Sequence, residues 1–301
     1  MVQKENATVN YRETDGAPPS DHTNDFYRKR FYDGIKCIHD RPCYRDYLKT
    51  EQDVFIKLFG KIRIETLKGA VTSEHINRAR YDLIKFLAFS DNPVSSAEIM
   101  NQINPNGSPR NLNDVRQFIY RTRQATDHLL SKGFHLIETT QTGYRLSTYL
   151  NIITDFSCFD EYCGNALDES NPIKKAEYLQ KAIDLYRGDI QESNDCGDKI
   201  GSAITSKYNR IFQNIIEEYC QIQYSLKNYD MIHQAATDAL YRGLNDPDIH
   251  YWIFMSLFAL NRTVSAEKYI EAVYHDLDRQ SAELLKKRIS ESLNSIINND
   301  V

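Results

Sequence analysis

The sequence predicts a mainly α-helical protein that carries one small α+β domain. Three observations support this prediction: an amphipathic helix followed directly by a short alternating segment near the middle of the chain, an alternating apolar segment before it, and helical periodicity through almost all of the second half. The 301 residues are enough for about two domains, each with a core of its own.

The net charge of −5 is unevenly distributed along the chain. Residues 53–148 hold 13 basic and 9 acidic side chains, whereas residues 149–301 hold 15 basic and 24 acidic ones. A basic domain beside an acidic one is typical of a DNA-binding domain joined to a protein-binding domain. The same asymmetry also occurs between domains that bind no DNA, so the charge distribution alone does not identify a DNA-binding domain and the sequence motifs are needed.

Residues 1–52 form an N-terminal arm that is polar at its start and aromatic and basic near its end. Residues 1–24 are expected to be disordered. The spacing of Cys37, His39 and Cys43 lacks the paired cysteines of structural zinc sites, so we expect a flexible or partly ordered arm and no metal. There is no secretory signal and no apolar run near the about 20 residues that span a bilayer. We therefore expect reduced cysteines and a cytoplasmic, nucleoid-associated protein without a membrane partner.

The first domain, residues 53–148, begins with alternating apolar side chains that predict two strands around Gly60. A polar connection leads to an amphipathic helix over 79–89, which Asn92-Pro93 ends. Ser95 or Ser96, with Glu98 nearby, can cap a short second helix. A loop rich in turn-forming residues follows over 104–110.

Residues 112–130 predict the third helix of this domain. Asn111 or Asn113 is a suitable N-cap, and apolar side chains recur close to the 3.6-residue period. The apolar positions are Leu112, Val115, Phe118, Ile119, Ala125 and Leu129. After a short connection, the alternating segment over 135–146 predicts a β-hairpin. A basic helix followed at once by a small hairpin is the arrangement of a winged helix-turn-helix, with a recognition helix and its wing.

The second domain, residues 149–301, is predicted to be a tetratricopeptide-like helical repeat array. Ala176-Glu177 recurs as Ala266-Glu267, and Leu185-Tyr186-Arg187-Gly188 recurs as residues 240–243. The repeat spacing is near the 34 residues of a tetratricopeptide unit, with an insertion over 189–202. The expected helix pairs are 173–187 with 203–226, 229–241 with 248–260, and 264–278 with 281–296. Such an array buries one continuous core, so Trp252 and residues 254–260 are expected inside.

Short motifs over residues 53–280 resemble the antibiotic-regulatory-protein type of bacterial transcriptional activators. In the first half they are FIKLFG (55–60), VSSAEI (94–99), VRQFIYRTRQA (115–125) and TGYRLS (142–147). In the second half they are DFSCFDEYCGNAL, KAIDLYRGDI and NDPDIHYWIFMSLFALNRTVSAEKYIEAV. Thr122 departs from the family pattern, which has a hydrophobic residue between two helix arginines. The resemblance implies a response-regulator-type winged helix followed by a bacterial transcriptional activation domain, with RNA polymerase as a partner.

On double-stranded DNA the exposed face of the third helix would enter the major groove, where Arg pairs with guanine and Asn or Gln with adenine. We expect base contacts from Asn113, Arg116, Gln117 and Arg121. We expect phosphate contacts, which position the protein without specifying sequence, from Arg110, Arg123, Gln124 and Lys132. The wing would place Thr140, Gln141, Tyr144 or Arg145 on the minor groove or the backbone. Each arginine could instead be a solvated surface charge or an ion-pair partner of Asp82, Asp114 or Asp127, and Arg123 an internal one.

No pattern predicts catalysis, a cofactor or a metal. The eight histidines are dispersed, and neither a Gly-x-Ser-x-Gly elbow nor a phosphate-binding glycine loop occurs. The paired carboxylates Glu217 and Glu218 are interpreted as surface residues. We therefore expect no enzyme but a sequence-specific transcriptional regulator that self-associates on repeated DNA sites. The resemblance implies that it is an activator. The alternative is a protein-interaction scaffold or a peptide-sensing regulator that uses the repeat groove.

Overall fold

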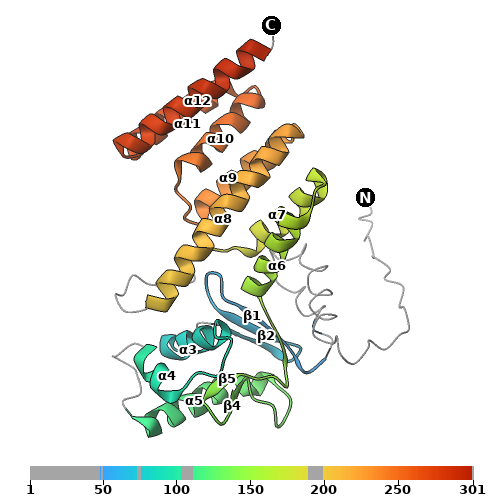
Figure 1. Cartoon of the computed structure of the whole chain (residues 1–301), viewed down its shortest axis with the longest axis vertical. Helices are drawn as coiled ribbons and strands as arrows, with labels where there is room; N and C mark the ends of the chain where they lie inside the picture. Colours follow the sequence, from blue (N-terminus) through green and yellow to red (C-terminus); the bar gives the residue numbers. More distant parts are fainter. Residues whose placement is uncertain (1–47, 49, 73–75, 103–110, 189–198, 300–301) are drawn as a thin grey trace, which may run out of the picture.

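The computed structural model describes residues 48, 50–72, 76–102, 111–188 and 199–299. Figure 1 shows a small sheet between two groups of helices, with an elongated helical array on one side. The predicted fold class, a small α+β domain followed by a helical domain, is confirmed. The predicted N-terminal arm, with Cys37, His39 and Cys43, lies almost wholly outside the described residues, although Leu48 near its end is buried in the core.

The sheet has four strands in the order β3-β2-β1-β6. Their bounds are Asp53–Lys57 (β1), Arg63–Thr66 (β2), Gly69–Thr72 (β3) and Asn151–Thr154 (β6). β1 and β2 are the two strands expected around Gly60, and they pair antiparallel. The φ of 70° at Gly60 is in the left-handed region that a glycine adopts without strain. The segment expected to be a polar connection instead begins with β3, which extends the sheet from β2.

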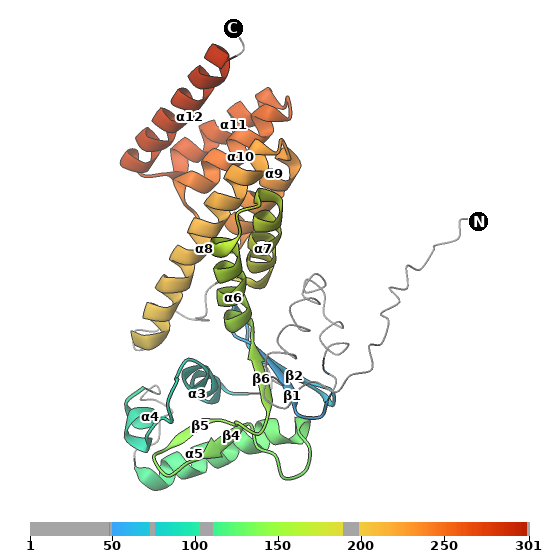
Figure 2. The same cartoon turned by 45° about the vertical axis from the view of Figure 1, so that its right-hand side comes forward.

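β6 pairs in parallel with β1, with Val54 opposite Ile152. The expected domain boundary between residues 148 and 149 therefore falls before the last strand of this sheet rather than after it. Thr154 ends β6 and caps helix α6 (Asp155–Asp168) through a reciprocal pair of hydrogen bonds with Ser157. Strand and helix thus form one continuous connection between the two halves of the molecule (Figure 2).

Three helices and a hairpin complete the first domain. The helices are Arg78–Ala88 (α3), Ser96–Gln102 (α4) and Leu112–Thr126 (α5), and α5 continues into a 3₁₀ turn, Asp127–Leu129 (η2). The hairpin strands are Ile137–Thr139 (β4) and Tyr144–Leu146 (β5). The predicted cap of the second helix is confirmed, because Glu98 N donates to Ser95 Oγ at 3.2 Å and Ser95 N donates to Glu98 Oε2 at 2.8 Å. The predicted loop over 104–110 lies outside the described residues.

Both faces of β1 are buried, because β1 lies between the two domains. Val54 and Ile56 pack with Ile84 of α3 on one face. Phe55 on the other face belongs to the core of the helical array, together with Phe159 of α6. The alternation in the sequence predicted only the first of these faces, since Phe55 and its neighbours are covered by helices about 100 residues later in the chain.

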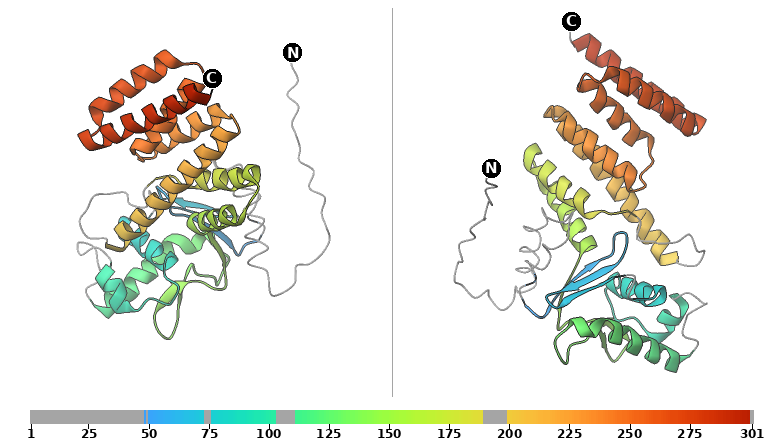
Figure 3. Two further views of the ribbon diagram at one scale, coloured as in Figure 1. Left: turned by 45° about the horizontal axis from the view of Figure 1, so that its top comes forward. Right: turned by 180° about the vertical axis from the view of Figure 1, so that it is seen from behind.

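The second domain has seven helices within the described residues. They are α6, Pro172–Leu185 (α7), Lys199–Ser225 (α8), Tyr229–Tyr241 (α9), Pro247–Ala259 (α10), Thr263–Asp276 (α11) and Arg279–Asn299 (α12). They stack into an extended array away from the sheet (Figure 3). α7 packs on α8 and α9 packs on α10, as the repeat pattern predicts, and Trp252 is buried. No described helix is both long and apolar enough to cross a bilayer.

The repeated Leu-Tyr-Arg-Gly motifs meet each other in space. Arg242, from the second motif, donates from Nη1 to the carbonyl oxygen of Tyr186 in the first motif at 2.8 Å, and also to that of Ile183. These carbonyls belong to the C-terminal end of α7, where helical carbonyl groups lack partners within the helix. The second motif therefore caps the first repeat.

The prediction that the helices over 264–278 and 281–296 pack on each other as a pair is wrong. Both helices form, but α12 packs chiefly on α10. Arg288 of α12 donates to Glu217 of α8 at 2.7 Å and to Asp248 of α10, and its guanidinium lies 3.9 Å from the Tyr251 ring centroid. Glu217 also accepts from Trp252 Nε1 at 2.5 Å. The interpretation of Glu217 as an ordinary surface carboxylate is therefore wrong.

Asp155, the first residue of α6, joins the array to the sheet. Its carboxylate accepts hydrogen bonds from Leu58 N at 2.8 Å and Phe59 N at 2.9 Å, just beyond β1. Complete burial raises the pKa of Asp155 to about 6, although these amide hydrogen bonds oppose the shift. At the same junction the Arg187 carbonyl oxygen lies only 3.3 Å from where a Cβ on Gly60 would be. The two domains thus share a buried polar contact as well as an apolar core.

Candidate nucleic-acid interface

Helix α5 forms where the sequence predicts it and is capped by Asn111. The Asn111 side chain accepts hydrogen bonds from Asn113 N at 2.9 Å and Asp114 N at 3.1 Å, which satisfies two otherwise unpaired amides of the first turn. Val115 and Ile119 are fully buried and pack in a cluster with α3, α4 and the hairpin. This packing fixes the rotation of α5 about its axis and so decides which side chains face outward.

The outward face of α5 and η2 is a single stripe along the helix. Its members recur at the spacings of one helical face and are all exposed: Leu112, Asn113, Arg116, Gln117, Tyr120, Arg121, Gln124 and His128. All four predicted base-contacting residues, Asn113, Arg116, Gln117 and Arg121, and the predicted phosphate contact Gln124 therefore lie on one surface. Arg110, which precedes α5, lies outside the described residues.

This outward face carries no carboxylate. Asp114 lies in the first turn of α5 and is half-buried. Asp127 accepts hydrogen bonds from the imidazole of His135 and from Leu136 N, on the side that faces the hairpin. Arg116 and Arg121 make no ion pair or hydrogen bond with other described residues. Two exposed guanidinium groups thus stand on a surface where nothing described neutralises them.

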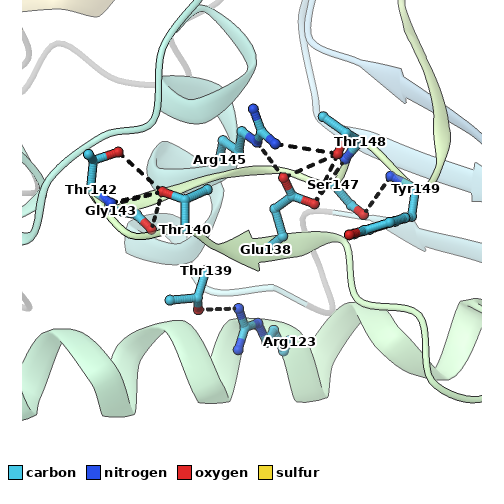
Figure 4. Close-up of polar contacts among 10 residues, drawn as sticks. All are labelled: Arg123, Glu138, Thr139, Thr140, Thr142, Gly143, Arg145, Ser147, Thr148 and Tyr149. Atoms are coloured by element: carbon cyan, nitrogen blue, oxygen red, sulfur yellow. Dashed lines mark hydrogen bonds and ion pairs between the residues drawn. The ribbon is translucent and has the colours of Figure 1, made fainter.

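The predicted hairpin is confirmed, with Glu138 opposite Arg145 in its register. Its turn is held by Thr140, whose Oγ accepts from Gly143 N at 3.1 Å and whose amide donates to the Gly143 carbonyl at 2.8 Å (Figure 4). Thr140 is half-buried by these contacts, whereas Gln141 at the tip is exposed. The hairpin has the position of a wing beside α5, and Lys132 in the preceding connection is exposed as well.

Gly143 brings the wing against the segment before α4. Val94 N donates to the Tyr144 carbonyl at 2.7 Å, and Tyr144 N donates to the Val94 carbonyl at 2.8 Å. A Cβ on Gly143 would lie 2.1 Å from the Val94 carbonyl oxygen, so no other residue fits here without a shift of the backbone. The glycine in the wing motif therefore has a steric role.

Besides Thr140 in the turn and Gln124, which donates to the Tyr120 hydroxyl, three of the predicted DNA-contacting side chains are occupied by the protein itself. Arg123 donates from Nε to the Ile137 carbonyl at 2.8 Å. It also donates from Nη2 to Thr139 Oγ1 at 2.9 Å (Figure 4), and the two bonds fasten α5 to the wing. Tyr144 is only 8% exposed and belongs to the core cluster under α5. These two contacts argue for structural roles rather than the expected DNA contacts.

Arg145, the third of these, pairs with Glu138 across the hairpin (Figure 4). Partial burial of Glu138 would raise the pKa of its carboxyl, but the hydrogen bonds from Arg145 and from Thr148 N outweigh that effect and lower it. Glu138 is thus ionised at neutral pH and balances the charge of Arg145. A DNA phosphate would have to compete with this pair for the arginine.

Two residues of the outward face differ from the sequence prediction. Leu112 was assigned to the buried face by periodicity, but its side chain is 57% exposed. Tyr120 was not singled out, yet it is 59% exposed and lies four residues from both Arg116 and Gln124. Its helical spacing from the arginines was the signal that could have identified it. Thr122 is fully buried, and its hydroxyl donates to the Phe118 carbonyl at 2.9 Å, which explains how a polar residue occupies this core position.

Comparisons with known proteins agree with this architecture. A solved structure of Mycobacterium tuberculosis EmbR in complex with a low-affinity phosphopeptide matches with a TM-score of 0.57 and 11% sequence identity. The match covers 79% of this chain and 65% of the EmbR chain, so this chain spans a little under two thirds of that protein. No family model matches the sequence, and no curated protein matches it significantly. At this identity the likeness establishes a shared fold of winged helix and helical array.

Proposed function

We propose that the protein is a sequence-specific DNA-binding transcriptional regulator that inserts α5 into the major groove. The observation that carries this proposal is the outward face of α5 and η2: eight exposed side chains, two of them arginines and none acidic, beside a hairpin in the position of a wing. A major groove is wide enough for one α-helix, and its phosphate walls favour a surface without carboxylates.

Individual roles follow from the geometry of this face. Asn113, Arg116, Gln117 and Arg121 contact base edges, because they are exposed and have the hydrogen-bonding groups that match guanine and adenine. Gln124, Lys132 and Gln141 lie at the margins and contact phosphates or the sugar backbone. Arg123, Tyr144 and Arg145 shape and hold the wing instead.

The helical array is free to contact other proteins while α5 is on DNA. α5 lies at the opposite end of the molecule from α12 (Figures 1 and 2). We infer that the array serves self-association on repeated DNA sites or contact with RNA polymerase. The alternative is that the array binds a peptide; the solved structure of EmbR, which shares this fold, is a complex with a phosphopeptide.

Footprinting of the DNA upstream of the protein's own gene tests the proposal. The wild type should protect a discrete site, and an Arg121→Ala/Gln117→Ala variant should lose that protection because each base contact contributes about 1–3 kcal/mol of discrimination. Arg279→Ala/Gln280→Ala is a matched control, since it removes the same two side-chain types from the exposed start of α12. Equal protection by all three proteins would show that these α5 side chains do not contact the bases. Absence of protection by the wild type even at low salt would refute the proposed function and direct attention to protein partners of the array.

A further inference from the structure

The outward face of α5 presents a large aromatic ring at its centre. Tyr120 lies one helical turn from Arg116, from Gln117 and from Gln124, so polar residues of the outward face surround it. It is 59% exposed, and none of the hydrophobic clusters of the described residues includes it. Its ring therefore contributes nothing to a core and is available to a ligand of this face.

The Tyr120 ring is held in one direction by its neighbour. Gln124 donates from Nε2 to the Tyr120 hydroxyl at 2.8 Å, one turn further along α5. This hydrogen bond restrains the phenol along the helix while the residue stays 59% exposed. A side chain that is already oriented loses less conformational entropy when a ligand packs on it.

Leu112 provides a second apolar group at the start of the same face. It is 57% exposed and stands eight residues before Tyr120, which corresponds to about 12 Å along the helix axis. A base-pair step is about 3.4 Å, so the two side chains are too far apart to contact the same base pair. Two exposed apolar side chains are therefore interspersed among the polar ones on the outward face of α5.

We propose that Tyr120 and Leu112 recognise the 5-methyl groups of two different thymines, so that the preferred DNA site contains thymines at fixed distances from the bases that the arginines contact. The argument is chemical: the thymine 5-methyl is the one apolar group that a base pair displays in the major groove. This inference rests on the proposed function, because it assigns the kind of base that the same face recognises.

The test begins with the duplex most enriched from a random-sequence library by the full-length protein. Each thymine in the enriched duplex is then replaced in turn by deoxyuridine, which lacks only the methyl group and keeps the base pair. Burial of one methyl corresponds to about a fourfold change in affinity, so two positions should each weaken wild-type binding by about that factor.

The variants assign these positions to side chains. In Tyr120→Ala one of the two thymine positions should become insensitive to deoxyuridine, and in Leu112→Ala the other. Tyr120→Phe is the matched control: it loses the hydroxyl and the Gln124 hydrogen bond but keeps the ring, so methyl sensitivity should remain. A general loss of folding would weaken all duplexes equally and would not abolish sensitivity at one position alone.

The outcomes separate this inference from the function on which it rests. If a duplex is enriched and bound but no deoxyuridine substitution weakens it, the methyl-recognition inference is wrong while DNA binding stands. The same conclusion follows if both sensitive positions persist in Tyr120→Ala and Leu112→Ala. If no duplex is enriched, the proposed function itself fails, and the inference fails with it.

Discussion

The guanidinium of Arg123 in α5 donates from Nε to the backbone carbonyl of Ile137 in β4 at 2.8 Å, and this hydrogen bond ties α5 to the hairpin. The same side chain reaches Thr139 through Nη2. A charged donor that serves two acceptors in the protein is engaged before any DNA arrives. Arg123 thus positions α5 and the hairpin relative to each other.

Replacement of Arg123 should therefore lower the stability of the protein, whereas its effect on DNA affinity should be small. Arg123→Ala should lower the free energy of unfolding by about 1–3 kcal/mol, because hydrogen bonds to a charged group are lost. Arg123→Lys should cost a similar amount, since an ammonium group cannot reproduce the two-pronged geometry. Urea unfolding measures both effects. A lysine variant as stable as the wild type would indicate that charge alone matters at this position.

The wing glycine should tolerate no side chain. Gly143→Ala places a Cβ 2.1 Å from the Val94 carbonyl oxygen and should destabilise the first domain by about 2–4 kcal/mol. Gly164→Ala in α6 is the matched control, because a Cβ there would meet nothing within 4 Å. That control should stabilise the protein by about 0.5–1 kcal/mol, as alanine does in a helix interior. Thermal unfolding of the two variants side by side would contradict this account if they shifted in the same direction.

Asp155 should make stability depend on pH in the acidic range. Its pKa is raised from 3.8 to about 6 in the folded protein, so the folded state binds a proton that the unfolded state has released between these values. Stability from this group is therefore fully present below pH 4 and is lost as the pH rises through about 6, by up to roughly 3 kcal/mol.

The comparison with Asp155→Asn isolates this effect, because the variant cannot titrate at that position. The free energy of unfolding of the wild type, minus that of the variant, should fall as the pH rises from 4 to 6. A difference that rises with pH would mean that the amide hydrogen bonds from Leu58 and Phe59 favour the carboxylate more than burial disfavours it.

Arg288 should be the residue that holds α12 on the array. Arg288→Ala removes the ion pairs with Glu217 and Asp248 and the contact with the Tyr251 ring, and leaves both carboxylates without their cationic partner. We expect a loss of about 2–4 kcal/mol. Arg279→Ala in the same helix removes only an exposed ion pair with Glu283 and should cost less than about 1 kcal/mol. Equal effects in urea unfolding would show that the Arg288 network adds nothing.

The elements with strong local periodicity were predictable from the sequence. The inward face of α5, its Asn111 cap and the boundaries of α9 and α10 follow from residues within one segment, where neighbouring positions determine the outcome. The hairpin after α5 was predictable for the same reason. The predicted base-contacting residues Asn113, Arg116, Gln117 and Arg121 do share one exposed face, although whether they contact DNA stays a prediction.

Elements that depend on distant partners were not predictable in the same way. β6 exists as a strand because β1, almost 100 residues earlier, offers it a parallel partner. α12 packs on α10, where Arg288 donates hydrogen bonds to Glu217 of α8 and to Asp248 of α10. Leu112 fits the apolar period of α5, but it precedes the packed turns of the helix and therefore stays exposed. None of these three features depends on neighbouring residues alone, so a local pattern in the sequence could not predict them.

The salt dependence of binding to generic duplex DNA tests the central claim most directly. Each phosphate that the protein neutralises contributes a slope of about −0.9 to the plot of log affinity against log salt concentration. The account predicts measurable binding at about 50 mM salt, a steep negative slope, and a slope shallower by about one unit in Lys132→Ala but unchanged in Arg279→Ala and Arg123→Ala. Absence of binding at that salt concentration, or a slope that responds to Arg279 as much as to Lys132, would contradict it.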